Sequence, residues 1–128
     1  MTGLSIWISV GVGGALGAVG RYGLTRAMTS SFGGGFPWGT FAVNILGSFL
    51  MGVMFSWLIE RNVGSPELRA FMTTGILGAF TTFSTYSLDV VLLLKERAYL
   101  EAGGYLLGSV LLSIAGLVLG MSITKALV

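Results

Sequence analysis

Four long runs of apolar residues, separated by short charged or glycine-rich segments, make up most of the sequence. We expect helices over residues 4–28, 38–59, 68–94 and 102–124, because about 20 apolar residues form a helix that crosses a hydrocarbon layer of ~30 Å. Most of the charged residues stand near the ends of these runs, as is typical of membrane-spanning helices. The pattern predicts an all-α membrane protein in which four transmembrane helices form a single domain over residues 1–128.

The third apolar run has a middle that is unfavourable for a continuous helix. Residues 75–87 combine two glycines with β-branched threonines and six hydroxyl side chains. Such side chains compete for backbone hydrogen bonds, and glycine lowers helix propensity. We therefore expect a broken third helix, with a break or kink inside this segment.

The composition of the chain excludes several classes of protein and of site. The chain is 54% hydrophobic and 9% charged, with a mean hydropathy of +0.90, which leaves too little polar surface to cover a soluble globule. It has no cysteine and no histidine, so we expect no disulfides, no thiolate metal site and no histidine-dependent enzyme chemistry. With seven scattered Lys and Arg residues and a net charge of +2, nucleic acid is not an expected partner. The first run lacks a preceding basic segment, so we interpret it as a retained helix and not as a cleaved signal peptide.

The cations are divided almost evenly between the two ends of the predicted helices. Three belong to one membrane face and four to the other, namely Arg61, Arg69 and Lys125 against Arg21, Arg26, Lys95 and Arg97. The positive-inside rule needs an imbalance to select one orientation. Such a chain can insert both ways round, and copies of opposite orientation can then pair as an antiparallel dimer. A single orientation set by Arg21 and Arg26 is the alternative.

Polar and aromatic side chains inside the apolar runs are candidates for function, since a polar group at membrane depth is costly. They are Asn44 in the second run, the hydroxyls of Thr81, Ser84 and Thr85 beside the aromatic series Phe80, Phe83 and Tyr86 in the third, and Tyr105, Ser109 and Ser113 at four-residue spacing in the fourth. Each has a structural alternative, because an amide can bind a neighbouring helix and a lone serine usually bonds the carbonyl four residues back. Together, amide and hydroxyl donors and ring edges can replace the hydration of a small anion. They also fit cations and neutral solutes, because a hydroxyl accepts as well as donates.

Glycines recur at four-residue spacing in the first and fourth runs. The pairs are Gly13 and Gly17, Gly104 and Gly108, and Gly116 and Gly120. In lipid this spacing lets two helix backbones approach closely. We interpret the pairs as packing surfaces and not as ligand sites.

The order of these motifs resembles that of the Fluc (CrcB-type) fluoride channel family. The resemblance is carried by residues 39–44, by residues 75–89 with their Thr-Thr-Phe-Ser-Thr core at 81–85, by the Gly20-Arg21 step and by the spacing of Tyr105 and Ser109. Length, number of spans and motif order agree over essentially the full chain.

The resemblance implies an antiparallel dual-topology homodimer in the bacterial inner membrane, through which cytoplasmic fluoride leaves passively and its toxicity is relieved. The residues that it implies along the fluoride pathway are Asn44, Phe83, Tyr86, Ser84, Thr85, Tyr105, Ser109 and Ser113. It places Arg21 in a vestibule, where the cation would attract anions. It also implies a structural sodium ion at the dimer centre, held by the backbone carbonyls of Gly78 and Thr81 from both subunits.

Three positions depart from the family pattern. Tyr86 stands where a second phenylalanine is usual and adds a hydroxyl to the lining. Ala79 replaces a common glycine at the expected break, which a methyl group stiffens. Asp89 replaces a glutamate and is one methylene shorter, which alters any ion pair or relay through it.

A small multidrug-type exporter that couples protons to cation export is the main alternative, because it shares the length, the four spans and the dual topology. That class needs an acidic residue in the first helix. The first run here contains no Asp or Glu, and the carboxylate well inside a span is Asp89 of the third. A subunit without transport activity is a further alternative, and we do not expect an enzyme.

Overall fold

The computed structural model of the chain describes residues 3–128, which are helical apart from short connections. In chain order the elements are α1 (Gly3–Phe32), α2 (Trp38–Met54), the π-helix η1 (Phe55–Glu60), α3 (Pro66–Ala70), the π-helix η2 (Phe71–Leu77), α4 (Gly78–Phe80), α5 (Phe83–Lys95) and α6 (Tyr99–Leu127). The described part of the chain contains no strand.

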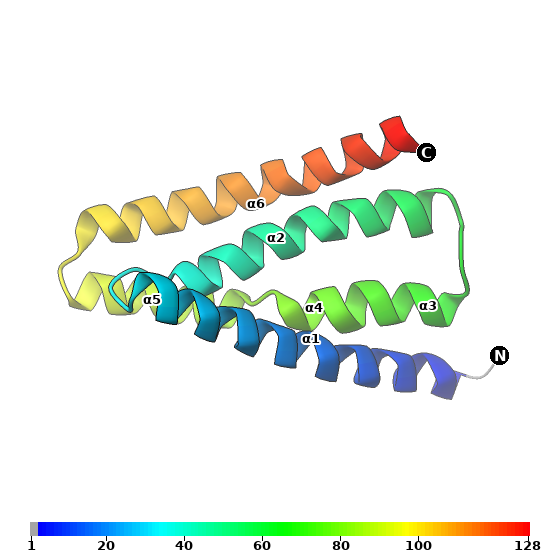
Figure 1. Ribbon diagram of the computed structural model, residues 1–128, viewed down its shortest axis with the longest axis horizontal. Helices are drawn as coiled ribbons and strands as arrows, with labels where there is room; N and C mark the ends of the chain where they lie inside the picture. The colour runs from blue at the N-terminus through cyan, green and yellow to red at the C-terminus, as the bar shows by residue number, and fades with distance from the viewer. Residues whose placement is uncertain (1–2) are drawn as a thin grey trace.

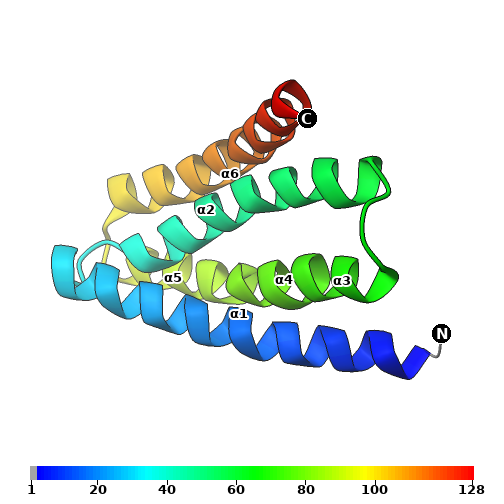
Figure 2. The ribbon, with the colours of Figure 1, turned by 45° about the vertical axis from the view of Figure 1, so that its right-hand side comes forward.

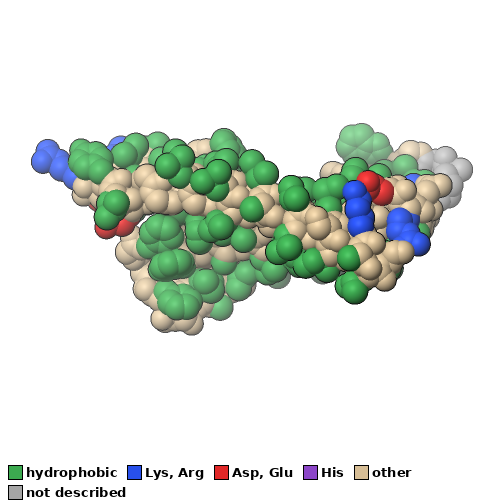
Figure 3. Space-filling model, turned by 90° about the horizontal axis from the view of Figure 1, so that it is seen from above, with side chains coloured by type: hydrophobic (Ala, Val, Ile, Leu, Met, Phe, Trp, Pro, Cys, Tyr) green, Lys and Arg blue, Asp and Glu red, His purple; other side chains and the backbone are tan. Residues whose placement is uncertain are grey.

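These elements form four helical spans that are long and apolar enough to cross a membrane. The spans are Gly3–Phe32, Trp38–Glu60, Pro66–Lys95 and Tyr99–Leu127. Apolar side chains cover the middle of the surface in Figure 3, and charged side chains gather toward its two ends. The prediction of an all-α membrane protein with four transmembrane helices is confirmed, and each predicted helix lies within an observed span.

The spans run alternately up and down the long axis of the bundle (Figure 1). The described N-terminal end of α1, the connection between η1 and α3, and the C-terminus lie at one end, while the other two connections lie at the opposite end (Figures 1 and 2). Helix α2 packs mainly on α6, and α1 packs mainly on η2. Helix α2 therefore lies between the third span and α6, and its polar residues face these two neighbours.

Glycine sets the closest helix contacts. A Cβ atom added to Gly17 would overlap the carbonyl oxygen of Ile76, and one added to Gly120 would overlap that of Phe49. These contacts join α1 to η2 and α6 to α2, as close backbone approach through glycine allows. Gly104, in contrast, has no atom of residues 3–128 within 4 Å of an added Cβ, so its predicted packing role finds no partner in the described part of one chain.

The helix of the third span is interrupted at Thr81 and Thr82. Their φ and ψ angles are −93° and 157° for Thr81 and −152° and 120° for Thr82, which are extended values between α4 and α5. The Thr82 hydroxyl accepts a hydrogen bond from the Thr85 N–H at 3.2 Å and so caps the start of α5. The two extended residues lie at the middle of the 30-residue span.

Candidate functional site

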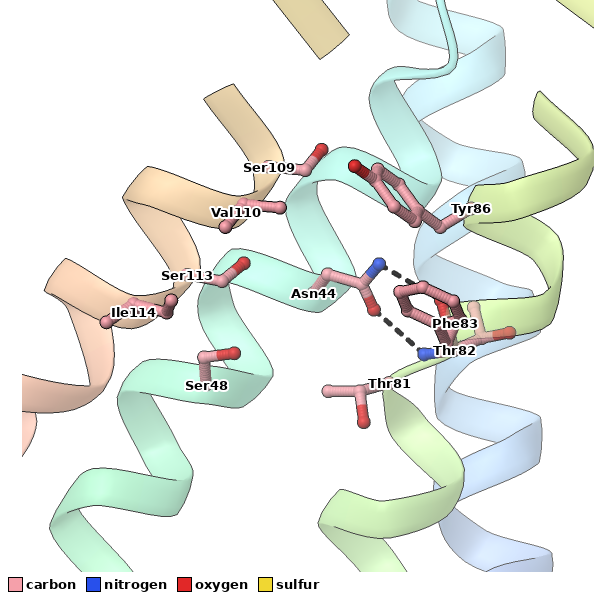
Figure 4. Close-up of a pocket in the computed structure, with 10 residues that line it drawn as sticks. All are labelled: Asn44, Ser48, Thr81, Thr82, Phe83, Tyr86, Ser109, Val110, Ser113 and Ile114. Atoms are coloured by element: carbon pink, nitrogen blue, oxygen red, sulfur yellow. Dashed lines mark hydrogen bonds between the residues drawn. The ribbon is translucent and has the colours of Figure 1, made fainter. Parts of the chain in front are cut away.

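A cavity bordered by several hydroxyl and amide side chains lies beside these extended residues, between α2, the third span and α6 (Figure 4). Its volume is about 310 Å³. The side chains around it are Asn44, Ser48, Thr81, Thr82, Phe83, Tyr86, Ser109, Val110, Ser113 and Ile114. Seven of these ten carry a hydroxyl or an amide and none carries a formal charge, which is unusual for a surface at membrane depth.

Asn44 is bonded through both ends of its amide to one residue of the third span. Its Nδ2 donates to the Thr82 carbonyl at 3.1 Å, and its Oδ1 accepts from the Thr82 N–H at 2.8 Å, as Figure 4 shows. Thr82 is the N-cap of α5, so its N–H has no helical partner and Asn44 supplies the acceptor, while the Asn44 amide also donates to the Thr82 carbonyl. Asn44 therefore holds the extended segment against α2.

Two aromatic rings form the wall on the α5 side. The ring centroids of Phe83 and Tyr86 lie 5.4 Å apart at an interplanar angle of 51°. The Phe83 side chain is 77% exposed, which leaves its edge available to the cavity and to whatever covers the bundle. The Tyr86 hydroxyl donates to the Leu106 carbonyl of α6 at 2.8 Å. The extra hydroxyl is thus engaged by the backbone of α6.

The opposite wall is a column of serines on α6. Ser109 and Ser113 point into the cavity, and Ser48 of α2 faces them (Figure 4). Ser109 is only 4% exposed, yet its hydroxyl has no hydrogen-bond partner within residues 3–128. Buried polar atoms are rarely left unpaired. This hydroxyl is therefore available to water or to an ion that enters the cavity.

Tyr105 lies one turn below Ser109 and does not line the cavity. It is fully buried, and its hydroxyl donates to Asp89 Oδ2 at 2.9 Å. Its ring lies 5.2 Å from that of Tyr86. Asp89 also borders a smaller hollow of about 120 Å³ near the connection between α1 and α2. Tyr105 thus stands between the two hollows.

The structure brings five of the eight predicted pathway residues to the cavity, namely Asn44, Phe83, Tyr86, Ser109 and Ser113. Ser84 and Thr85 lie in the first turn of α5, where the Ser84 hydroxyl is 3.3 Å from that of Thr82. Ser48 and Thr82 were not predicted as lining residues. Ser48 follows Asn44 by four residues and could have been found from that spacing.

The remaining predicted residues lie near the extended segment. Thr81 borders the cavity, and Gly78 is on an exposed face of α4 where an added Cβ would meet one atom, the Thr73 oxygen, at 3.5 Å. Arg21 of α1 donates from Nε to the Ala79 carbonyl at 3.0 Å and does not line the cavity. No group of three or more His, Cys, Asp or Glu side chains that could bind a metal occurs in the described residues.

Four apolar spans, three of which border an uncharged cavity, define a multi-pass membrane protein with polar side chains inside its spans. Comparison with known proteins gives its family. The family model described as CrcB-like protein, Camphor Resistance (CrcB), matches residues 8–121. The chain therefore belongs to the CrcB-like family.

Relatives from several bacteria are similar over nearly their full length. The chain is 44% identical over 118 residues to a protein of Hahella chejuensis, which covers 92% of this chain and 93% of the relative. It is 48% identical over 117 residues to a protein of Phenylobacterium zucineum, with 91% and 92% covered. A Rhizobium meliloti relative is 42% identical over 119 residues, with 93% and 95% covered. All three are named fluoride-specific ion channel FluC.

Proposed function

We propose that this chain is a fluoride-specific ion channel and not an enzyme. The observation that carries the proposal is the uncharged cavity at mid-span, lined by the Asn44 amide, a column of serines and the edge of Phe83. Hydroxyl and amide hydrogens and ring edges all present positive potential to an anion. The names of the relatives supply the identity of the ion.

Passage through this site requires that protein groups replace the water around fluoride without holding the ion. Ser109 is the strongest candidate for a direct contact, because its buried hydroxyl has no partner among residues 3–128. Ser113 lies one turn further along α6, so a second hydroxyl can take over as the ion moves. The absence of a fixed positive charge in the cavity lining lets the ion leave. Transport is passive and relieves fluoride toxicity by releasing cytoplasmic fluoride down its gradient.

The working unit that we propose is an antiparallel homodimer in the bacterial inner membrane. The near-equal cation count supports insertion in both orientations. The exposed ring of Phe83 and the open face at Gly104 support a second copy as the cover of this side of the bundle. In such a dimer Ser84, Thr85 and Tyr105 would line the parts of the pathway that continue from the cavity.

A structural sodium ion fits the donor atoms available at the interruption of the third span. Backbone carbonyl oxygens suit a hard monovalent cation, and the described residues lack a cluster of carboxylates that would suit a divalent one. Gly78 and Thr81 would hold the ion through their carbonyls. One chain offers two of these groups, so a second copy is needed to complete a coordination shell. Bound there, sodium would be coordinated by carbonyl oxygens that lack amide partners.

The proton-coupled cation exporter gains no support from these observations. Helix α1 contains no carboxylate, and Asp89 of the third span accepts a hydrogen bond from Tyr105 at 2.9 Å. An exporter of cations would also place its acidic group in the substrate cavity, and the cavity here has none.

Fluoride efflux from liposomes tests the channel proposal directly. Purified protein is reconstituted with internal potassium fluoride, valinomycin sets the voltage, and an electrode measures released fluoride. We expect rapid release of fluoride and no release from matched liposomes loaded with potassium chloride. Folded protein that releases no fluoride would refute the proposal.

Dual topology has a separate test, which the absence of native cysteine makes clean. Val63→Cys places one thiol in the exposed connection between η1 and α3. If both orientations are present, a membrane-impermeant maleimide added outside intact cells labels about half of the protein. Labelling of all or none of it would establish a single orientation.

A further inference from the structure

Arg21 is a full positive charge inside the first span. It lies about 5 Å from the midpoint of the 30-residue helix α1, at a rise of ~1.5 Å per residue. Its side chain is half-buried, and Nε donates to the Ala79 carbonyl at 3.0 Å. A cation at this depth is costly and is retained where a partner and a function offset the cost.

The Ala79 carbonyl needs this donor because of where it lies in the third span. Ala79 belongs to α4, which ends at Phe80, and the next two residues are extended. The last carbonyls of a helix lack the amide four residues ahead. Within residues 3–128, the third span is therefore held from two sides, by Arg21 before the extended residues and by Asn44 at Thr82.

The position of Arg21 is fixed by the glycine face of α1. Gly13 and Gly17 bring α1 into backbone contact with η2, and Gly20 faces the Phe80 ring at 3.6 Å from an added Cβ. Arg21 follows Gly17 by one turn on the same helix, so the close contact between α1 and η2 places its guanidinium beside the end of α4. Arg26, five residues further along, instead donates to the Tyr22 hydroxyl at 3.2 Å and is exposed.

We propose that Arg21 is a positioning residue for the ion pathway, which acts through its hydrogen bond to Ala79 more than through its charge. It orients the end of α4 and thereby sets where Thr81, Thr82 and the Phe83 ring stand in the cavity. Arg21 itself does not line that cavity. The inference deepens the proposed channel function and rests on it for its transport readout. It replaces a role of pure anion attraction, which the family resemblance implies.

Two substitutions separate the hydrogen bond from the charge. Arg21→Lys keeps the charge and replaces the planar guanidinium by a single ammonium group, which is a poor substitute for a fixed Nε donor. Arg21→Gln removes the charge and keeps an N–H donor. Arg26→Gln is the matched control, because it removes a cation from the same helix without touching the third span.

Amide hydrogen exchange in nanodiscs measures the positioning role without any transport. We expect peptides that cover residues 80–86 to exchange roughly tenfold faster in Arg21→Lys, as expected for the loss of one hydrogen bond from a charged donor. Arg26→Gln should exchange like the wild type. Wild-type exchange in Arg21→Lys would overturn the proposal. In liposomes we expect Arg21→Lys to lower fluoride flux at all fluoride concentrations. A role of the charge alone predicts instead that Arg21→Lys keeps the wild-type flux, and that Arg21→Gln loses flux that a high fluoride concentration restores.

A measurement on the unmodified protein covers the case in which the variants do not fold. In nitrogen-15 NMR spectra, the Arg21 Nε–H should exchange with water more slowly than the Arg26 Nε–H, because only the former bonds a backbone carbonyl. Equal exchange of the two would refute the inference. A wild-type protein that carries no fluoride but shows the protected Nε–H would refute the channel function and leave the positioning role intact.

Discussion

Replacement of Asn44 by leucine removes the amide that holds Thr82 and keeps a side chain of similar volume. Two hydrogen bonds are lost, at 2.8 and 3.1 Å. A protein hydrogen bond contributes about 0.5–1.5 kcal/mol net, and those between membrane helices average about 0.6 kcal/mol. The Thr82 N–H then depends on water in the cavity, because the N-cap position of α5 gives it no helical acceptor. We therefore expect Asn44→Leu to lower the free energy of unfolding by about 1–3 kcal/mol.

Equilibrium unfolding by titration of SDS into neutral micelles measures this loss, with helical circular dichroism as the signal. Ser48→Ala is the matched control, because Ser48 lies one turn away on α2 and borders the same cavity, and its side chain makes no hydrogen bond within residues 3–128. We expect the control to change stability by less than about 0.5 kcal/mol. If Asn44→Leu and Ser48→Ala unfold alike, the clamp between Asn44 and Thr82 does not stabilise the protein.

Asn44→Asp refines the same prediction. The carboxylate can still accept from the Thr82 N–H, but its second oxygen faces the Thr82 carbonyl, where Asn44 donates. An ionised carboxylate in the cavity also repels fluoride. We expect flux to fall more than stability does. Flux at the wild-type rate would mean that the ion does not pass Asn44.

Three further substitutions test other contacts. Gly17→Val should prevent folding of the bundle, because the new side chain meets the Ile76 backbone; a monodisperse, folded variant in size-exclusion chromatography would contradict the glycine contact. Phe83→Ile should abolish fluoride flux and leave assembly unchanged, since it removes the ring edge and keeps an apolar side chain; liposome flux at the wild-type rate would show that the ring edge is not needed. Tyr86→Phe should retain flux and lose about 1 kcal/mol of stability with the bond to the Leu106 carbonyl; unchanged SDS unfolding would show that this bond contributes nothing.

The sequence was sufficient to locate the spans and most of the cavity, because both follow from the cost of polar groups in lipid. Apolar runs set the helices, and Asn44, Ser109 and Ser113 were identified as polar residues inside those runs. The partner of Asn44 could not be predicted, since Thr82 is 38 residues away and the contact depends on how α2 packs on the third span. Long-range pairing of this kind leaves no periodic signal in a single sequence.

The helical faces on which residues 81–85 lie could not be predicted from the sequence for a second reason. Spacing along a continuous helix places Thr81, Ser84 and Thr85 on adjoining faces. Two extended residues change the rotation of the chain, so Thr81 borders the cavity while Ser84 and Thr85 fall in the capping turn of α5. The proposed role of Arg21 could not be predicted for the same reason. The Ala79 carbonyl lacks a backbone partner, and so is free to accept from Arg21, only because the helix stops there.

Replacement of Ser109 should affect stability in a way opposite to the replacement of Asn44. Polar side chains around the cavity are mostly engaged: Asn44 binds Thr82, and Tyr86 binds α6. Ser109 is buried and, among residues 3–128, unpaired. A residue that stabilises nothing and yet remains polar at this depth is explained by function. We expect Ser109→Ala to leave the free energy of unfolding unchanged or to raise it by up to about 1 kcal/mol while fluoride flux falls. A loss of stability as large as that of Asn44→Leu would show that the hydroxyl supports the fold, and unchanged flux would remove it from the pathway.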